Sequence, residues 1–114
     1  MMEFWHNSRC AKSREALALL RSKGIEPEVR EYLKTPPSRD EIADVVRKLS
    51  LSSARGLMRT KEAVYAERGL GEVEDEDALI DALAEEPRLI ERPVLINGPK
   101  AAIGRPAENI LEAV

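Results

Sequence analysis

Residues 3–14 read EFWHNSRCAKSR, and three kinds of local structure follow one another within them. The first four residues form a short run that contains aromatic side chains, which is typical of a strand. The next three have the composition of a turn. From Cys10 onward apolar residues recur at helical spacing, as at Leu17 and Leu20. The stretch therefore predicts a strand, a turn and a helix, with Cys10 at the point where they meet.

The chain that follows predicts a second strand and a second helix. The second strand is expected over residues 26–33, before the break that residues 35–37 (TPP) impose. Ser38 then predicts the start of a helix, because Glu41 three residues on completes a capping box. Residues 42–49 carry apolar side chains at i, i+3, i+4 and i+7, which is one apolar stripe.

Three further helical segments are expected in the middle of the chain. They cover residues 53–58, 61–68 and 76–86. Gly69 and Pro87 supply the stops, because Gly accepts the left-handed conformation and Pro cannot continue a helix.

In the last third of the chain, the spacing of apolar residues changes from a helical pattern to one typical of strands. Residues 94–96 (VLI) predict a buried strand, Asn97-Gly98 is a hairpin turn signal, and residues 101–103 predict the return strand. Pro106 suits the first turn of a final helix. Its inward face is expected to carry Ile110, Leu111 and Val114.

The predicted order of elements is β-α-β, a helical insertion, then β-β-α. A parallel βαβ unit followed by an antiparallel hairpin and a helix is the thioredoxin-like plan, an α/β fold with a mixed four-stranded sheet. We expect one domain over residues 1–114, with the helical insertion at about residues 38–87.

Composition excludes several classes of function. The chain has 114 residues, 43 % of them apolar and 34 % charged, with a net charge of −3. A nucleic-acid-binding domain usually carries a basic face, so that class is disfavoured. No apolar run approaches the ~20 residues that span a membrane. The N-terminus lacks the pattern of a signal peptide, so we expect a cytoplasmic protein. We also expect a monomer.

The counts of Cys and His limit the chemistry further. One Cys permits neither an internal disulfide nor a resolving Cys within the chain. One His makes a conventional Cys/His zinc site unexpected, so we expect no metal.

Cys10 is the main candidate for chemistry. The first N–H groups of a helix have no internal partner, and the helix dipole places partial positive charge there, so a thiolate is favoured and the pKa of Cys10 should be lowered. Ser13 can offer a hydroxyl to the thiolate or to a ligand. Nearby positive charge comes from Arg9, Lys12 and Arg14. The alternative is that Cys10 is an inert, half-buried small residue.

Three more residues are candidates for the site because of their expected positions in the fold. His6 ends the first strand and could support the thiolate, although a single His is more often structural. Arg92 and Arg105 each precede a Pro at an element boundary, where arginines are usually solvated. In a thioredoxin-like fold, however, the residues before the third strand lie beside the active Cys. The Pro at that position, here Pro93, is commonly cis.

Six segments of the chain resemble the glutaredoxin-coupled arsenate reductases, in order along the sequence. They are residues 6–14 (HNSRCAKSR), 32–38 (YLKTPPS), 57–59 (LMR), 65–70 (YAERGL), 91–94 (ERPV) and 104–106 (GRP). Together they span essentially the whole chain, which is similar to the short chromosomal branch of that family.

The resemblance implies a function and a set of site residues. It implies that Cys10 is the nucleophile and that three arginines bind arsenate or arsenite: Arg59, Arg92 and Arg105. It also implies supporting roles for His6 and Ser13, to which we add their neighbours in the expected site, Asn7 and Pro93. No cofactor is expected to be bound. Glutathione is the implied co-substrate and a glutaredoxin the implied partner, which agrees with the lack of a second Cys.

Two alternatives remain open on the sequence alone. Relatives of this fold include regulators that bind RNA polymerase and sense redox state, but these usually carry Cys-x-x-Cys, whereas residues 10–13 here read CAKS. The second alternative is exchange of glutathione mixed disulfides, which would need Cys10 but not all three arginines.

Overall fold

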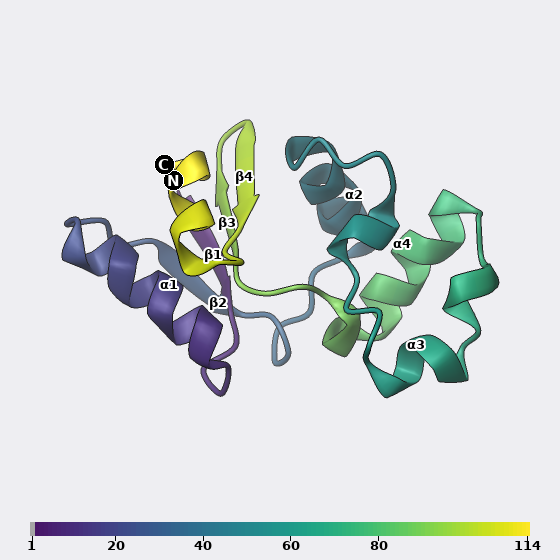
Figure 1. Ribbon diagram of the computed structural model, residues 1–114. Helices are drawn as coiled ribbons and strands as arrows, with labels where there is room; N and C mark the ends of the chain where they lie inside the picture. The colour runs from purple at the N-terminus through teal and green to yellow at the C-terminus, as the bar shows by residue number, and fades with distance from the viewer. Residues whose placement is uncertain (1) are drawn as a thin grey trace. The chain divides into compact units, whose positions relative to one another are not determined.

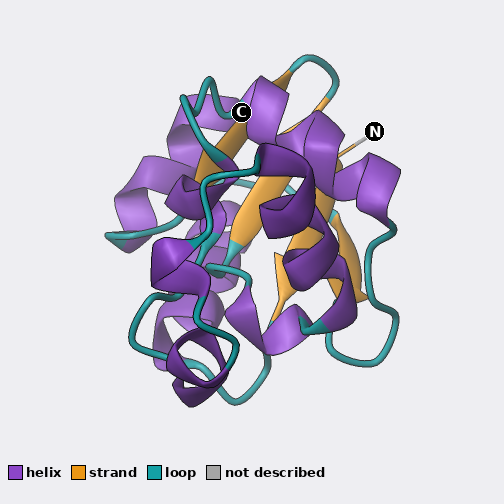
Figure 2. Cartoon of the chain, turned by 90° about the vertical axis from the view of Figure 1, so that its right-hand side faces the viewer, coloured by secondary structure: helices purple, strands orange, loops and turns teal. Residues whose placement is uncertain are grey.

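The computed structural model describes residues 2–114 and divides them into two compact units. Residues 2–35 join Arg92–Val114 in the first unit, and Pro36–Glu91 form the second. The described strands all belong to the first unit, whereas the second is helical (Figure 1). Figure 2 shows the strands in orange and the helices in purple. The insertion predicted at about residues 38–87 falls within the second unit. That residues 1–114 form a single domain stays a prediction.

The first unit is built on a mixed four-stranded sheet. Its strands are β1 (Met2–His6), β2 (Glu28–Glu31), β3 (Val94–Asn97) and β4 (Lys100–Ile103), in the order β2-β1-β3-β4. β1 pairs parallel with β2 and antiparallel with β3, and β3 pairs antiparallel with β4. Helix α1 (Ala11–Ser22) connects β1 to β2. This arrangement confirms the predicted thioredoxin-like α/β fold.

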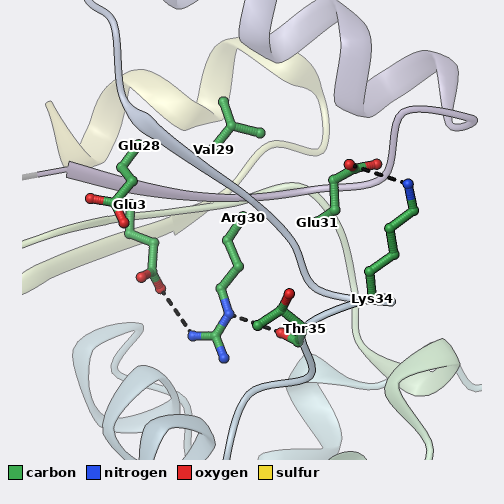
Figure 3. A pocket seen from close by; sticks show the side chains of 7 residues that line it. All are labelled: Glu3, Glu28, Val29, Arg30, Glu31, Lys34 and Thr35. Atoms are coloured by element: carbon green, nitrogen blue, oxygen red, sulfur yellow. Dashed lines mark hydrogen bonds and ion pairs between the residues drawn. The ribbon is translucent and has the colours of Figure 1, made fainter.

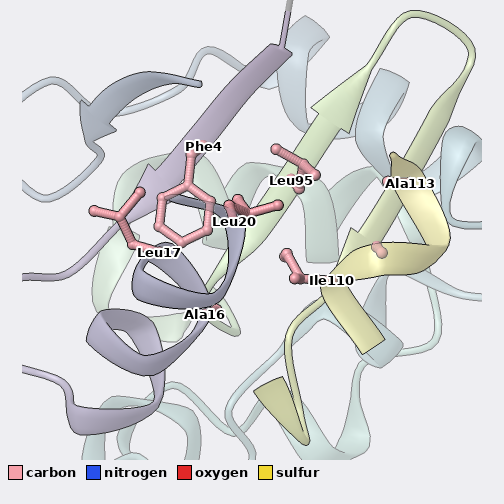
Figure 4. Packing of buried hydrophobic residues seen from close by; sticks show 8 residues of the cluster. Phe4, Ala16, Leu17, Leu20, Leu95, Ile110 and Ala113 are labelled. Atoms are coloured by element: carbon pink, nitrogen blue, oxygen red, sulfur yellow. The ribbon is translucent and has the colours of Figure 1, made fainter. Parts of the chain in front are cut away.

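The core of this unit lies between the sheet and two helices. Phe4, Leu95 and Ala102 occupy one row across β1, β3 and β4, so their side chains share one face of the sheet. Helix α1 and the 3₁₀ helix η4 (Ala107–Ala113) pack on that face (Figure 4). The helices contribute Ala16, Leu17, Leu20, Ile110 and Ala113 to the cluster. Helical periodicity in α1 and alternation in the strands therefore bury the residues that position the site.

Strand β2 is shorter at both ends than the predicted strand over residues 26–33. Pro27 has no N–H and cannot donate to the ladder, so pairing begins after it. The strand ends at Glu31 because its carbonyl accepts from the N–H groups of Lys34 and Thr35, at 2.9 and 3.0 Å, which turns the chain.

A surface pocket of about 480 Å³ lies against β2 (Figure 3). Arg30 crosses it, with Nη1 3.6 Å from Glu3 Oε1 and Nε donating to the Thr35 carbonyl oxygen at 2.9 Å. The pocket is lined by β2, by Glu3 and by the turn after β2. It includes none of the site residues predicted from the sequence.

The β3–β4 hairpin turns one residue later than predicted. Asn97 pairs with Lys100 as the last pair of the ladder, so the two-residue loop is Gly98-Pro99 rather than Asn97-Gly98. Gly98 has a φ of 58°, a conformation that glycine adopts without steric cost.

The final helix differs in type from an α-helix. The Asn109 N–H donates to the Pro106 carbonyl oxygen at 3.0 Å, which is the i→i+3 bond of a 3₁₀ helix. With three residues per turn, Ile110 and Ala113 stack on the same side and are buried. Val114, expected to face inward, is 41 % exposed, so that expectation was wrong.

The second unit contains short helices around an apolar interior. They are α2 (Arg39–Lys48), η1 (Ala54–Leu57), α3 (Ala63–Glu67), η2 (Leu70–Glu72), α4 (Glu76–Glu85) and η3 (Pro87–Leu89). Gly69, with a φ of 61°, separates α3 from η2, which confirms the predicted stop. No helix within residues 2–114 is long and apolar enough to cross a membrane.

The start of α2 confirms the predicted capping box. The Glu41 backbone N–H donates to Ser38 Oγ at 3.1 Å, and the Ser38 N–H donates to Glu41 Oε1 at 2.9 Å. Ile42 and Val45, the first members of the predicted stripe, are buried. The helix is tied to α4 by an ion pair of 2.9 Å between Arg39 and Asp77.

Candidate functional site

Cys10 lies at the junction of β1 and α1, as predicted. It is the N-cap of α1, with extended backbone angles. Its N–H donates to the Asn7 carbonyl oxygen at 3.0 Å, and its own carbonyl accepts the first helical hydrogen bond from Arg14 at 3.0 Å. The sulfur therefore belongs to the helix end that carries partial positive charge.

The surroundings of Cys10 favour the thiolate. Burial by itself raises the pKa of the thiol, and this is the largest single influence. It is outweighed by the backbone N–H of Ser13, the charge and side-chain hydrogen bond of Arg92, and the backbone N–H of Lys12. The pKa of Cys10 is consequently below its ordinary value, as expected for a nucleophilic thiol.

Two of the predicted arginines meet at Cys10. Arg105 Nη2 lies 3.7 Å from Cys10 Sγ, although 95 residues separate them in the chain. Arg92 also faces the sulfur and lowers its pKa. The Nε and Nη1 atoms of Arg92 are buried and have no hydrogen-bond partner among the described residues. Buried guanidinium donors without a partner are suited to an oxyanion, which offers several acceptor oxygens.

A close backbone contact fixes the segment that carries Arg92. The Arg92–Pro93 and Arg105–Pro106 peptide bonds are both cis. The Gly104 N–H donates to the Pro93 carbonyl oxygen at 2.9 Å, and a Cβ on Gly104 would lie 2.8 Å from Pro93 Cγ. Gly104 belongs to the segment 104–106 that resembles the family, but the sequence alone assigned no role to it. Its signal is a glycine placed directly before an Arg-Pro pair.

His6 and Ser13 support the loop rather than the sulfur directly. Ser13 Oγ lies 2.7 Å from His6 Nδ1 and accepts from the Asn7 N–H at 3.0 Å. The expected hydroxyl contact to the thiolate is therefore replaced by contacts to β1 and the turn, and it is the backbone N–H of Ser13 that lowers the pKa of Cys10. Burial lowers the pKa of His6, partly offset by Glu31, and so favours the neutral imidazole.

Arg59 lies in the helical unit, after η1. Its backbone N–H donates to the Leu89 carbonyl oxygen at 2.7 Å, next to a bridge between Met58 and Ile90. Its guanidinium forms an ion pair with Glu62, with 2.9 Å between Nη1 and Oε2. The first unit thus brings together Cys10, Arg92 and Arg105, while the role of Arg59 stays a prediction.

The site residues suggest binding of an anion rather than a metal cation. Arginine side chains are donors without acceptors, and a single thiolate is too few ligands for a structural zinc site. Across residues 2–114, no group of three or more His, Cys, Asp or Glu side chains is placed to hold a metal ion.

The similarity to known proteins covers nearly the whole chain. The ArsC family profile matches residues 5–113. An arsenate reductase of Neisseria meningitidis is 52 % identical, covering 99 % of this chain and 97 % of the relative. The protein YfgD of Escherichia coli K12, whose function is uncharacterised, is 46 % identical over 99 % of this chain and 96 % of its own. The solved structure of an arsenate reductase from Vibrio cholerae superposes with a TM-score of 0.96 at 45 % identity, covering 99 % and 97 % of the two chains.

The fold and the thiol at the start of α1 define a thioredoxin-like protein with a single cysteine, which is free. Within that class, the chain belongs to the ArsC family. The resemblance of the six sequence segments to arsenate reductases is thereby confirmed at the level of the family.

Proposed function

We propose that this protein reduces arsenate to arsenite, with Cys10 as the nucleophile. The observation that carries the proposal is the convergence of Arg92 and Arg105 on a sulfur whose pKa is lowered. A thiolate and two guanidiniums suit attack on a tetrahedral oxyanion, because the cations bind the oxygens and the sulfur reaches the central atom. Relatives at about half identity that are named arsenate reductases support the same assignment.

The first step joins Cys10 to arsenic. The thiolate attacks As(V), an S–As bond forms, and one arsenate oxygen takes up protons and leaves as water. Arg92 and Arg105 hold the remaining oxygens and stabilise the charge that develops on them. We assign Arg59 to the same oxyanion, as the family resemblance implies.

The second step transfers two electrons. The thiol of glutathione attacks the Cys10 sulfur, an S–S bond forms, and the S–As electron pair stays on arsenic, which leaves as arsenite. A second thiol, from glutathione or a glutaredoxin, then reduces the mixed disulfide and restores Cys10. The sequence has one Cys, so the second thiol must come from outside the chain. These donors also imply a cytoplasmic location.

The experiment is a coupled assay with purified protein, glutathione, glutaredoxin, glutathione reductase and NADPH. We expect NADPH oxidation that depends on arsenate and is lost in Cys10→Ser. Absence of arsenate-dependent turnover, with a Cys10 that still forms a mixed disulfide with glutathione, would overturn the proposal in favour of thiol exchange or regulation.

The place of Arg59 is tested with a matched variant. Arg59→Gln should raise the arsenate KM, because one oxyanion ligand is lost. Arg47→Gln removes another arginine of the helical unit that also pairs with a carboxylate three residues away, Asp44, and should leave the KM unchanged. Equal KM values for the two variants would remove Arg59 from the site.

A further inference from the structure

A second pocket, of about 320 Å³, borders the turn that leads to Cys10. It is lined by residues 6–9, which end β1 and enter that turn, and by Glu31, Leu33 and Lys34, at the end of β2 and just after it. All of these residues belong to the first unit. A concave site of this volume is large enough for a small organic ligand.

The pocket lies within reach of the thiol. The Cys10 N–H donates to the Asn7 carbonyl oxygen at 3.0 Å and so closes a four-residue turn. The first and last Cα atoms of such a turn are less than about 7 Å apart. Asn7, Ser8 and Arg9, the first three residues of the turn, all line the pocket. An extended tripeptide is about 10 Å long, so a ligand of that length can occupy the pocket and extend to Cys10.

The pocket holds an acidic and a basic group side by side. Lys34 Nζ lies 3.5 Å from Glu31 Oε2, and the two side chains are 76 % and 42 % exposed (Figure 3). Ser8 Oγ donates to Glu31 Oε1 at 3.5 Å. Ion pairs this exposed contribute little to stability, so a ligand can engage both charges at little cost to the fold.

These charges match those of an α-amino acid. Its ammonium and carboxylate are bonded to the same carbon atom, so they can face Glu31 and Lys34 at the same time. Arg9, exposed on the turn directly before Cys10, supplies a second positive charge for a second carboxylate. Leu33 is 44 % exposed and offers apolar surface to the methylene groups of a ligand.

Glutathione carries this set of charges. At neutral pH it has an ammonium and a carboxylate on its γ-glutamyl residue and a second carboxylate on its glycine, with the thiol between the two ends. We propose that the pocket binds glutathione, with Glu31 and Lys34 holding the γ-glutamyl end and Arg9 the glycine carboxylate. The central cysteine is then directed toward Cys10. The proposal rests on the proposed function, in which glutathione attacks the Cys10 sulfur, and it names the residues that select this thiol.

The test compares two disulfides in the absence of arsenate. In each reaction the Cys10 thiolate attacks one sulfur of the disulfide, forms a mixed disulfide and releases the other half as a thiolate. Glutathione disulfide carries the charges that the pocket recognises, whereas hydroxyethyl disulfide carries none. The ratio of the two rate constants, measured by mass spectrometry of the intact protein, therefore reports recognition, because a change in the reactivity of Cys10 alters both rate constants alike.

Lys34→Glu should lower this ratio roughly tenfold, because a favourable charge becomes a repulsive one. The matched control is Lys23→Glu, which makes the same change of charge at the exposed C-cap of α1, outside the pocket, and should keep the wild-type ratio. An unchanged ratio in Lys34→Glu, or an equal fall in both variants, would overturn the proposal.

A modified ligand tests the place of Arg9. The binding probe is S-methylglutathione, which cannot react, followed by NMR of the backbone amides. We expect the amide signals of residues 7–9 and 31–34 to shift. Esterifying the glycine carboxylate of the probe should weaken its binding to the wild type roughly threefold to fivefold, and should have no effect on its binding to Arg9→Gln. An equal loss in both proteins would overturn the assignment of Arg9, and shifts confined to other residues would overturn the pocket.

These results can be separated from those that test the proposed function. If the coupled assay shows no arsenate-dependent turnover but Lys34→Glu lowers the ratio, arsenate reduction is wrong and the pocket stands as a glutathione site for thiol exchange. If turnover is present but Lys34→Glu keeps the wild-type ratio, arsenate reduction stands and the glutathione pocket is wrong.

Discussion

Arg105 Nε donates a hydrogen bond to the main-chain carbonyl oxygen of Arg92 at 2.8 Å. The same guanidinium places Nη2 3.7 Å from Cys10 Sγ. One planar fork therefore connects the segment before β3 to the thiol. A lysine ammonium has no such fork, so charge alone cannot reproduce the arrangement.

Arg105→Lys should consequently raise the arsenate KM roughly tenfold, although the positive charge is kept. Steady-state kinetics in the coupled assay give the value. Arg88→Lys, a change at an exposed arginine paired with Glu86, should behave like the wild type. A wild-type KM for Arg105→Lys would show that the fork geometry is not needed.

Arg92→Gln should raise the pKa of Cys10. Arg92 favours the thiolate through both its charge and a side-chain hydrogen bond, and glutamine removes the charge. The midpoint of the pH dependence of iodoacetamide alkylation reports this pKa. It should move upward in Arg92→Gln and remain in place in Arg88→Gln. An unchanged midpoint for Arg92→Gln would contradict the electrostatic role.

Gly104→Ala should destabilise the protein by about 1–3 kcal/mol, because the added methyl group must be accommodated in a packed contact. The new Cβ would meet Pro93 Cγ at 2.8 Å and Ala16 Cβ at 3.3 Å. Urea unfolding measures the change. Gly71→Ala meets only an ordinary contact of 3.7 Å to Tyr65 and is the matched control. Equal stability of the two variants would show that the contact at Pro93 is loose.

The stability of the protein should fall as the pH drops below the ordinary His6 pKa of 6.5. Burial lowers the pKa of His6 in the folded protein, so the unfolded chain takes up the proton first and is favoured as pH falls. Urea unfolding at about pH 7.5 and about pH 5.5 brackets this change. His6→Gln should show a smaller loss between the two conditions, whereas an equal loss would assign the effect to other groups.

Ser38→Ala should cost about 1 kcal/mol of unfolding free energy, because the capping box at α2 loses its side-chain acceptor. Ser52→Ala, at an exposed serine in the loop before η1, should have almost no effect. Thermal and urea unfolding of the two variants provide the comparison. Loss of the same stability in both would argue against the cap.

Structural features that depend only on neighbouring residues could be predicted from the sequence. Ser38 and Glu41 are three residues apart, and Gly69 acts on its own backbone, so both depend on neighbours alone. The limits of β2 depend on Pro27 and on hydrogen bonds to Glu31, which override strand propensity at the two ends. The final helix is a 3₁₀ helix that buries Ile110 and Ala113, and the apolar periodicity of the sequence does not distinguish this type from an α-helix.

The site could be predicted in part from the sequence, for the same reason. The position of Cys10 at a helix start follows from the local pattern, whereas its contact with Arg105 joins residues at opposite ends of the chain and required the topology. The partners of Ser13 and the close approach of Gly104 to Pro93 depend on atomic distances, which sequence does not contain.

The central position of the β1–β3 pairing has a consequence for the integrity of the chain. Both connections of the helical segment Pro36–Glu91 lead into one sheet, in which residues from the start and the end of the chain form adjacent strands. A single cleavage inside that segment would divide the chain into two fragments, each of which carries strands of the sheet and part of its apolar cluster. The protein is therefore suited to fragment complementation, in which a thiol on one piece and two arginines on the other are reunited by refolding the sheet.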